Sequence, residues 1–194
     1  NNKNVLITGA SRGIGASIAQ KFLEEGANTI IVSRGSKELF SFETKLKKKY
    51  GKERIHAEVC DCTSAASLNS LEEKIKGSGK IIDIVVANVG DGRSSNDPIP
   101  ADSYWTKTWS QNFDSALYTA RTFLPMLKES KGNLLFISSI TGKEAFGAPV
   151  DYSTAKTAVI AFSKNLAKNL GEEVRVNTIA PGNVFFPKGS WDKQ

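Results

Sequence analysis

The sequence has little cysteine, histidine and proline: two, one and six of its 194 residues respectively. Cys60 and Cys62 stand so close together in an apparent strand that they cannot staple a fold, which fits a reducing compartment better than a disulfide framework. His56 lies on the same segment, and the three together do not match the spacing of a metal site. We therefore expect no metal and interpret all three as packing residues.

Long hydrophobic runs are also missing. No apolar stretch approaches the roughly 20 residues of a membrane span, and no charged-then-apolar leader is seen. We therefore expect a cytoplasmic protein that does not act at a membrane. The length suits one domain over residues 1–194, and a hydrophobic content of 40% is enough to bury a single core.

Positive charge is in excess, at a formal net charge of +6. Part of it comes from four lysines interleaved with Leu46 and Tyr50 near the end of a predicted helix: Lys45, Lys47, Lys48 and Lys49. Cations at that position complement the helix dipole and sit in solvent. No aromatic and basic RNA motif accompanies them, so we expect no nucleic-acid partner. A basic RNA-binding domain is the alternative, and its affinity would fall steeply with salt.

Apolar, β-branched runs alternate along the chain with segments of helical spacing. The runs are residues 4–7, 28–32, 54–59, 81–87, 132–137 and 174–179. The clearest helical segments are residues 11–25, 101–127 and 151–170. Most of the runs are apolar on both faces, as is typical of strands covered by helices on each side. The sequence therefore predicts an α/β fold with a doubly wound parallel sheet, a Rossmann fold.

A glycine-rich turn joins the first predicted strand to the first helix, in residues 8–15, TGASRGIG. Gly9 would permit the tight turn, Gly13 would let the backbone approach a diphosphate, and Gly15 would let the helix pack on the sheet. The exposed amides and positive dipole at the start of the helix favour an anion. A glycine cluster by itself can be only a turn, but its place after the first strand favours a dinucleotide site.

The end of the second predicted strand bears on which dinucleotide binds. An acid there accepts hydrogen bonds from the ribose of NAD, whereas cations accommodate the extra phosphate of NADP. This chain has Ser33 and Arg34 at that point, and Arg12 of the glycine turn can reach the same place. We therefore expect a preference for NADP(H), with NAD(H) possible. The alternative is that Arg34 is only a surface residue.

A tyrosine and a lysine lie one helical turn apart at Tyr152 and Lys156. An ammonium near a phenol lowers its pKa, which would let Tyr152 exchange a proton near neutral pH. The alternative is a Tyr and a Lys that merely occupy an amphipathic helix. Ser138 and Ser139 end the fifth predicted strand, at the edge where ligands bind in open α/β sheets, and this favours the catalytic interpretation.

These motifs together resemble the short-chain dehydrogenase/reductase family. The spacing Gly-x-x-x-Gly-x-Gly after Thr8 is similar to the family's cofactor motif, and residues 137–142 with 152–156 are similar to its catalytic stretch. The resemblance implies that Ser139, thirteen positions before the tyrosine, polarises the substrate carbonyl. It implies that Tyr152 is the general acid in reduction and the base in oxidation. Lys156 would lower the pKa of Tyr152 and bind the nicotinamide ribose.

Further positions match the family. Asn112, a polar residue on an apolar helical stripe, corresponds to an asparagine that bends the helix and helps hold a water that feeds protons to the lysine. Asp61, followed by Cys62, is similar to the acid that contacts adenine, and residues 88–90 resemble a signature in which Val89 replaces alanine. The remaining positions that the resemblance assigns to the cofactor are Ser11, Ile14, Asn88, Gly90, Pro181 and Gly182.

The resemblance runs from Val5 to Gly182, and the family's domain continues into a substrate-covering segment and a last strand. Relative to the family we therefore expect this chain to be incomplete at its C-terminal side. The resemblance also implies a homodimer or homotetramer, formed through the helices that carry Asn112 and Tyr152. Substrates open to such a site are a 3-oxoacyl thioester, a sugar, a steroid-like ketone or another carbonyl or alcohol. A non-catalytic dinucleotide sensor or partner-binding protein is the alternative function.

Overall fold

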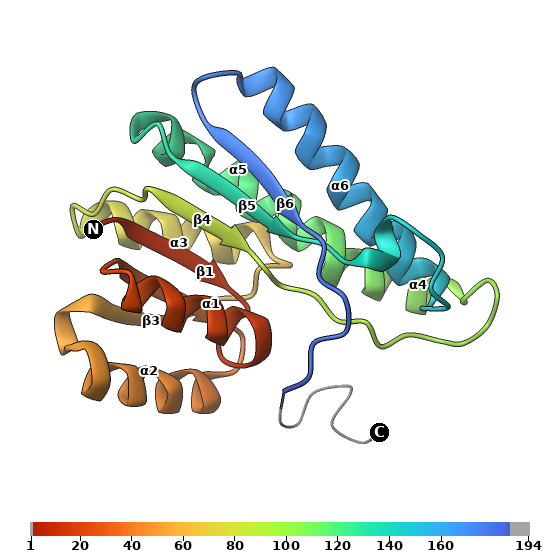
Figure 1. The fold of residues 1–194 in the computed structure, drawn as a ribbon, viewed down its shortest axis with the longest axis horizontal. Helices are drawn as coiled ribbons and strands as arrows, with labels where there is room; N and C mark the ends of the chain where they lie inside the picture. Colours follow the sequence, from red (N-terminus) through yellow and green to blue (C-terminus); the bar gives the residue numbers. More distant parts are fainter. Residues whose placement is uncertain (1, 187–194) are drawn as a thin grey trace.

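A parallel six-stranded sheet in the order β3-β2-β1-β4-β5-β6 forms the centre of the molecule. The computed structural model describes residues 2–186, and Figure 1 shows the sheet with helices on either side. The chain crosses over between β1 and β4, so this pair marks the switch point at which ligands bind in doubly wound sheets. The strands are β1 Asn4–Thr8, β2 Asn28–Ser33, β3 Ile55–Val59, β4 Ile84–Ala87, β5 Asn133–Ile137 and β6 Arg175–Ile179.

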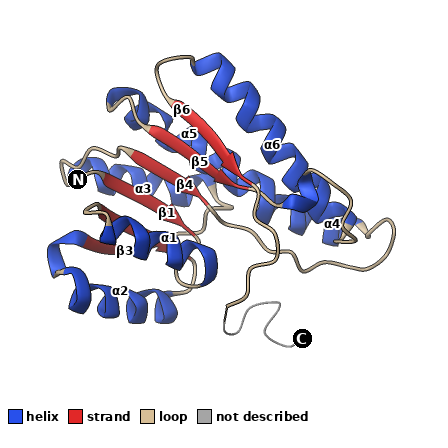
Figure 2. Ribbon diagram, in the orientation of Figure 1, coloured by secondary structure: helices blue, strands red, loops and turns tan. Residues whose placement is uncertain are grey.

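The helices form two layers (Figure 2). α1 and α2 cover β1, β2 and β3 on one face, while α3, α5 and α6 cover the other face of the sheet. The helices are α1 Gly13–Glu24, α2 Ser36–Tyr50, α3 Ala65–Gly77, α4 Asp102–Trp109, α5 Ser115–Glu129 and α6 Val150–Leu170. The predicted doubly wound fold is confirmed, and each predicted strand lies within three residues of its expected limits.

The long helix predicted over residues 101–127 is wrong in one respect. It is divided by a π-helical turn, Ser110–Asp114, that separates α4 from α5. Asn112 lies at the centre of this turn and is fully buried. A π-turn inserts an extra residue into the helical ladder, which redirects side chains and is frequent at functional sites.

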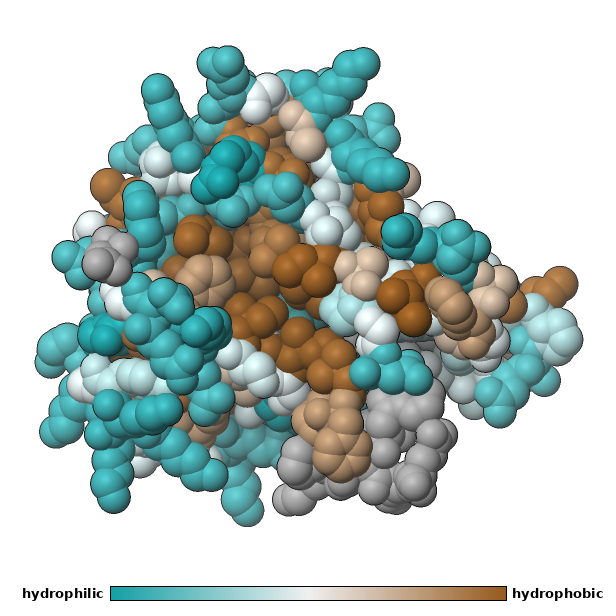
Figure 3. Space-filling view, viewed as in Figure 1, coloured by the Kyte–Doolittle hydropathy of each residue, from teal (hydrophilic) through white to brown (hydrophobic). Residues whose placement is uncertain are grey.

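One part of the sheet departs from the expectation of strands covered on both faces. On the side of α1, no helix of residues 2–186 packs over β6, and Ile179 is half exposed there while Ile84 and Leu135 are only partly buried. The space-filling view shows hydrophobic side chains gathered in the middle of this face (Figure 3). Arg175 and Asn177 are exposed on this face of β6 while Val176 between them is buried, so the first part of the strand is polar on the side that no helix covers.

Two smaller expectations concern residues outside the site. Cys60 and Cys62 follow β3 rather than lying in it, and both thiols are free and buried. Of the four lysines predicted near the end of a helix, Lys47, Lys48 and Lys49 occupy the last turn of α2, and Lys45 lies just before it. Within residues 2–186 no three His, Cys, Asp or Glu side chains gather as ligands of a metal ion. In the same range, no helix combines the length and apolar character needed to cross a membrane.

Candidate active site

The glycine turn lies at the switch point, between the end of β1 and the start of α1. Gly9 and Gly13 both have positive φ, at +64° and +57°, a conformation that favours glycine. A methyl group at Gly15 would clash with the Gly9 carbonyl and lie 2.5 Å from the side-chain amide of Asn88. The helix start can therefore approach the sheet only because residue 15 has no side chain.

Asn88, just after β4, holds this turn in place. Its side-chain amide donates to the carbonyl oxygens of Thr8 and Gly9 at 3.0 and 3.1 Å, and its backbone N–H donates to the Thr8 hydroxyl at 3.0 Å. The turn is also joined to β2 by a hydrogen bond from Ala10 to Val32. Asn88, assigned to the cofactor by resemblance, thus has a defined structural task as well.

The N-terminus of α1 fits an anionic group. Arg12 is the N-cap and makes no side-chain capping bond, and the first turn contains no acidic residue. The first amides of a helix have no partners within it, and here no carboxylate competes for them. These residues therefore fit the diphosphate of a dinucleotide.

Phe186 is the exception to this fit. A Cβ built on Gly13 would lie 2.8 to 3.1 Å from the Phe186 ring, so the ring rests against the backbone that we expected a diphosphate to approach. The segment after β6 runs from the end of that strand toward the side of α1 (Figure 1). A diphosphate resting on Gly13 requires this ring to move.

Of the residues predicted to bind the additional phosphate, only Ser33 has a side-chain hydrogen-bond partner among residues 2–186. Arg34 and Arg12 have exposed side chains, and the Ser33 hydroxyl donates to the Gly35 carbonyl at 3.1 Å. The pKa of the Asp91 carboxyl is lowered: desolvation acts to raise it, but hydrogen bonds and charge from Arg93 outweigh this, with a smaller contribution from the charge of Arg12.

At the end of β3, the side chains of Asp61 and Cys62 differ in their surroundings. The Asp61 carboxylate accepts hydrogen bonds from the backbone and hydroxyl of Thr63, at 3.0 and 2.8 Å, and is half-buried. The Cys62 thiol lies in the hydrophobic core, so only the backbone of this residue is left to contact a cofactor. The assignment of Cys62 to the cofactor site, together with Asp61, stays a prediction.

Ser138 and Ser139 directly follow β5, and their hydroxyls make different contacts. The Ser138 hydroxyl is turned inward and donates to the Lys156 carbonyl of α6 at 2.8 Å. The Ser139 hydroxyl accepts from the backbone and hydroxyl of Thr141, and it lies close enough to the Tyr152 phenol to lower the pKa of that group. Of the two serines, Ser139 is therefore the one whose hydroxyl is near the tyrosine, which is the serine that the resemblance selects.

The phenol of Tyr152 does not titrate as predicted. Burial raises its pKa, the nearby Ser139 hydroxyl acts in the opposite direction, and the charge of Asp91 raises the pKa further. The Lys156 amine lies 5.9 Å from the centre of the Tyr152 ring and donates to the Ile137 carbonyl at 3.1 Å. The predicted lowering of the phenol's pKa by Lys156 is therefore wrong for this structure, because desolvation of the phenol outweighs a cation that is directed elsewhere.

Lys156 is itself perturbed. Its side chain is 3% exposed, and burial lowers its pKa from 10.5 to about 8. A buried amine has lost the water that would stabilise its charge, so it releases its proton more readily. Lys156 can therefore change its charge within the ordinary range of pH.

Asn112 connects the π-turn to the loop after β4. Its side-chain oxygen accepts from the Asp91 backbone N–H at 3.0 Å, and its amide donates to the carbonyls of Asp91 and Thr108 at 3.0 and 2.9 Å. A Cβ on Gly90 would lie 2.8 Å from the Asn112 oxygen and 2.9 Å from the Lys156 amine. Gly90 therefore lets the two polar groups approach the same point.

Pro181 and Gly182 lie beside the same site. The Pro181 carbonyl accepts from Ile140 at 3.0 Å, just beyond Ser139, and a Cβ on Gly182 would contact the Ile140 side chain. The structure thus brings Asn112, Ser139, Tyr152 and Lys156 to one edge of the sheet, with Pro181 and Gly182 next to them.

Two carboxylates near Tyr152 were missed by the sequence analysis. Asp91 accepts three side-chain hydrogen bonds from Arg93, and Asp151 is buried at the start of α6. Their positions, directly after residues 88–90 and directly before Tyr152, could have drawn attention to them. Phe186 carried no comparable signal.

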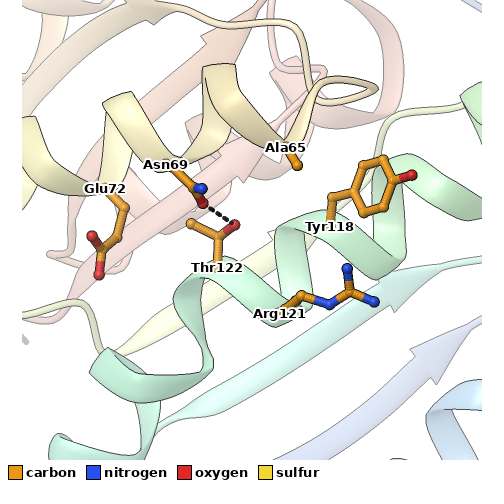
Figure 4. A pocket seen from close by; sticks show the side chains of 6 residues that line it. All are labelled: Ala65, Asn69, Glu72, Tyr118, Arg121 and Thr122. Atoms are coloured by element: carbon orange, nitrogen blue, oxygen red, sulfur yellow. Dashed lines mark hydrogen bonds between the residues drawn. The ribbon is translucent and has the colours of Figure 1, made fainter.

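A separate groove of about 380 Å³ lies between α3 and α5 (Figure 4). Thr122 donates to Asn69 across it at 3.3 Å, and the Arg121 guanidinium lies 5.8 Å from the centre of the Tyr118 ring. None of the predicted site residues lines this groove, so its shape has no part in the site described above.

The structure is that of an α/β protein of the dinucleotide-binding class. Three features define this class: the sheet order, the glycine turn at the switch point, and the serine, tyrosine and lysine at the edge of the sheet. The family model of the short chain dehydrogenases matches residues 3–187. The chain belongs to the short-chain dehydrogenase/reductase family of oxidoreductases.

Individual relatives agree with this membership. A 3-oxoacyl-[acyl-carrier-protein] reductase of Chlamydia muridarum is 33% identical over 185 residues, which are 94% of this chain and 74% of that protein. The NADPH-bound short chain oxidoreductase of Pseudomonas aeruginosa, described as having an atypical catalytic centre, superimposes with a TM-score of 0.92 at 27% identity over 98% of this chain and 74% of that one. L-sorbose reductase of Gluconobacter frateurii, in complex with NADPH and L-sorbose, gives 0.90 at 30% identity over 96% and 72%.

Proposed function

We propose that the protein catalyses reversible reduction of a carbonyl compound to an alcohol, with NADP(H) as the preferred cofactor and NAD(H) as a possible one. The observation that carries the proposal is that Tyr152 and the buried Lys156 lie one turn apart on α6, with the Ser139 hydroxyl close enough to the phenol to lower its pKa. The exposed cations Arg12 and Arg34 support the preference for NADP(H). When bound, the nicotinamide supplies or accepts the hydride.

The chain's own residues would divide the remaining work. Tyr152, whose raised pKa keeps it protonated at neutral pH, donates its proton to the substrate oxygen in reduction. The Ser139 hydroxyl donates a hydrogen bond to the same oxygen and stabilises the charge that develops there. Lys156 holds a positive charge below a pH of about 8 and binds the nicotinamide ribose, while Asn112 maintains the π-turn beside it.

The cofactor would lie over the glycine turn. The residues that we propose to hold it are Gly9, Ser11, Arg12, Gly13, Ile14, Gly15, Ser33, Arg34, Asp61, Cys62, Asn88, Gly90, Tyr152, Lys156, Pro181 and Gly182. We propose assembly as a homodimer or homotetramer through α4, α5 and α6. Among substrates, a 3-oxoacyl thioester and a sugar are favoured because a Chlamydia relative is a 3-oxoacyl reductase and a Gluconobacter neighbour binds L-sorbose.

The direct test is Tyr152→Phe, assayed by NADPH oxidation against a panel of 3-oxoacyl thioesters, sugars and ketones. We expect turnover to fall about 10²- to 10⁴-fold, because the proton donor is lost while the ring remains. NADPH affinity, measured by fluorescence titration, should stay within about twofold. Tyr104→Phe, at a half-exposed tyrosine of α4, is the matched control. Retention of most activity by Tyr152→Phe would contradict the assignment of the acid.

A further inference from the structure

Asp151 is a buried carboxylate that the proposed reaction does not use. It is 1% exposed, it directly precedes Tyr152, and among residues 2–186 no lysine or arginine nitrogen lies within 4 Å of it to form an ion pair. A carboxylate buried without a cation is costly unless hydrogen bonds satisfy its oxygens. Its retention beside the tyrosine therefore needs a compensating contact.

Hydrogen bonds supply that contact on both oxygens. One accepts from the backbone N–H of Tyr152 at 2.9 Å, within the first turn of α6, where the helix dipole favours a negative charge. The other accepts from the hydroxyl of Ser94, in the loop after β4. Asp151 thus joins the residue that carries the phenol to a loop more than fifty positions earlier in the chain.

The same loop is held from α4 and from the π-turn. The Thr108 hydroxyl, buried at the end of α4, lies 3.4 Å from that of Ser94 and donates to it. At the other end of the loop, Asn112 binds both the N–H and the carbonyl of Asp91. The four residues from Asp91 to Ser94 are therefore fixed at both ends.

The fixed loop forms a wall beside the phenol. A Cβ on Gly92 would lie 3.7 to 3.8 Å from three carbons of the Tyr152 ring, which is ordinary van der Waals contact. Ser94 therefore connects the backbone of Tyr152, through Asp151, to the loop that flanks its ring. Movement at either end of this connection would shift the phenol relative to Ser139.

We propose that Asp151 is a positioning residue, which aims the Tyr152 phenol by holding the start of α6 to the loop at Ser94. The inference rests on the proposed function in that Tyr152 moves the proton. Proton transfer requires the donor within hydrogen-bond reach of its acceptor, and a misplacement of about 1 Å can cost about a hundredfold in rate. Loss of the connection should therefore lower kcat and leave cofactor binding largely unchanged.

The test compares Asp151→Ala, Ser94→Ala and the double variant. We expect each single variant to lower kcat about 10- to 100-fold at saturating substrate. NADPH affinity should stay within about twofold in each. The double variant should be no slower than the slower single variant, because both changes break one connection. Asp151→Asn keeps one oxygen acceptor and should recover part of the lost kcat.

The matched control is Asp102→Ala, which removes an exposed carboxylate from the first turn of α4 and should leave kcat within about twofold. A second readout does not need activity: the ring signal of Tyr152 in protein labelled with ¹³C-tyrosine, assigned with Tyr152→Phe. We expect this signal to move in Asp151→Ala and Ser94→Ala and to stay unchanged in Asp102→Ala. Should Asp151→Ala fail to fold, Ser94→Ala carries both measurements.

The inference is overturned if Ser94→Ala keeps its kcat and its tyrosine signal, or if the losses of the single variants multiply in the double variant. Failure of the proposed function has a different signature. In that case the unchanged protein shows no NADPH oxidation with any carbonyl compound, while the tyrosine signal still reports whether Asp151 and Ser94 orient the ring.

Discussion

At the scale of the residue, the amine of Lys156 is buried, and among residues 2–186 it has no carboxylate within 4 Å and donates only to the Ile137 carbonyl. Burial lowers its pKa to about 8, against 10.5 for an exposed lysine. Between these values the unfolded chain binds a proton that the folded protein does not. The free energy of unfolding should therefore increase as pH rises from about 8 to 10.5. Below pH 8 the buried amine is charged, and its burial lowers the free energy of unfolding by the full amount.

Lys156→Met tests this cost. At pH 7 we expect the free energy of unfolding to increase by about 1 to 2 kcal/mol, because a penalty of about 3 kcal/mol is removed and a hydrogen bond of about 1 kcal/mol is lost. Turnover should be abolished. Urea unfolding of both proteins at pH 7 and at pH 10.5 gives the measurement, and the difference between them should shrink at the higher pH. A variant with a lower free energy of unfolding than the original at pH 7 would show that burial of the charged amine does not destabilise the fold.

At the scale of the element, the turn between β1 and α1 depends on close approach of backbone to backbone. Gly15 is the position where a side chain has no room, since even a methyl group would meet the Gly9 carbonyl. Asn88 contributes from the adjacent strand by binding the two carbonyls that the turn leaves unpaired. The hydrogen bonds of Asn88 thus hold the glycine turn against the end of β4.

Gly15→Ala should weaken NADPH binding at least tenfold, because the helix start must move away from the turn. Gly35→Ala is a matched control, since that glycine has φ of −85° and no atom within 4 Å of a Cβ. Fluorescence titration of NADPH gives both affinities, and circular dichroism shows whether each variant is folded. Equal affinities for the two variants would mean that the close approach at Gly15 is unimportant for the cofactor.

At the scale of the whole molecule, cofactor binding should be coupled to stability. A ligand that binds only the folded state at a hundred times its Kd stabilises it by about 2.7 kcal/mol. Arg12 and Arg34 both have exposed side chains, and two cations at the predicted phosphate site favour the cofactor with the additional phosphate.

We therefore expect NADPH to raise the Tm more than NADH does at equal concentration. Arg34→Ala should remove most of this difference by weakening NADPH binding, whereas Lys37→Ala, an exposed cation in the first turn of α2, should leave it intact. Thermal unfolding with each cofactor gives the comparison. A larger shift with NADH than with NADPH would reverse the proposed preference.

The sequence by itself determined the sheet, the glycine turn and the residues that gather at the strand ends. Hydrophobic periodicity, glycine spacing and the interval between Tyr152 and Lys156 are local patterns, and local sterics and helical geometry fix their outcome.

Only the tertiary structure decided the pKa values of the site residues and the hydrogen bonds that hold them in position. The direction of the Tyr152 pKa depends on how deeply the ring is buried and on Asp91, which no spacing in the chain reveals. The π-turn at Asn112 and the contact between Asp151 and Ser94 join segments that are distant in sequence. Desolvation and such long-range hydrogen bonds arise from packing, and packing exists only once the chain has folded.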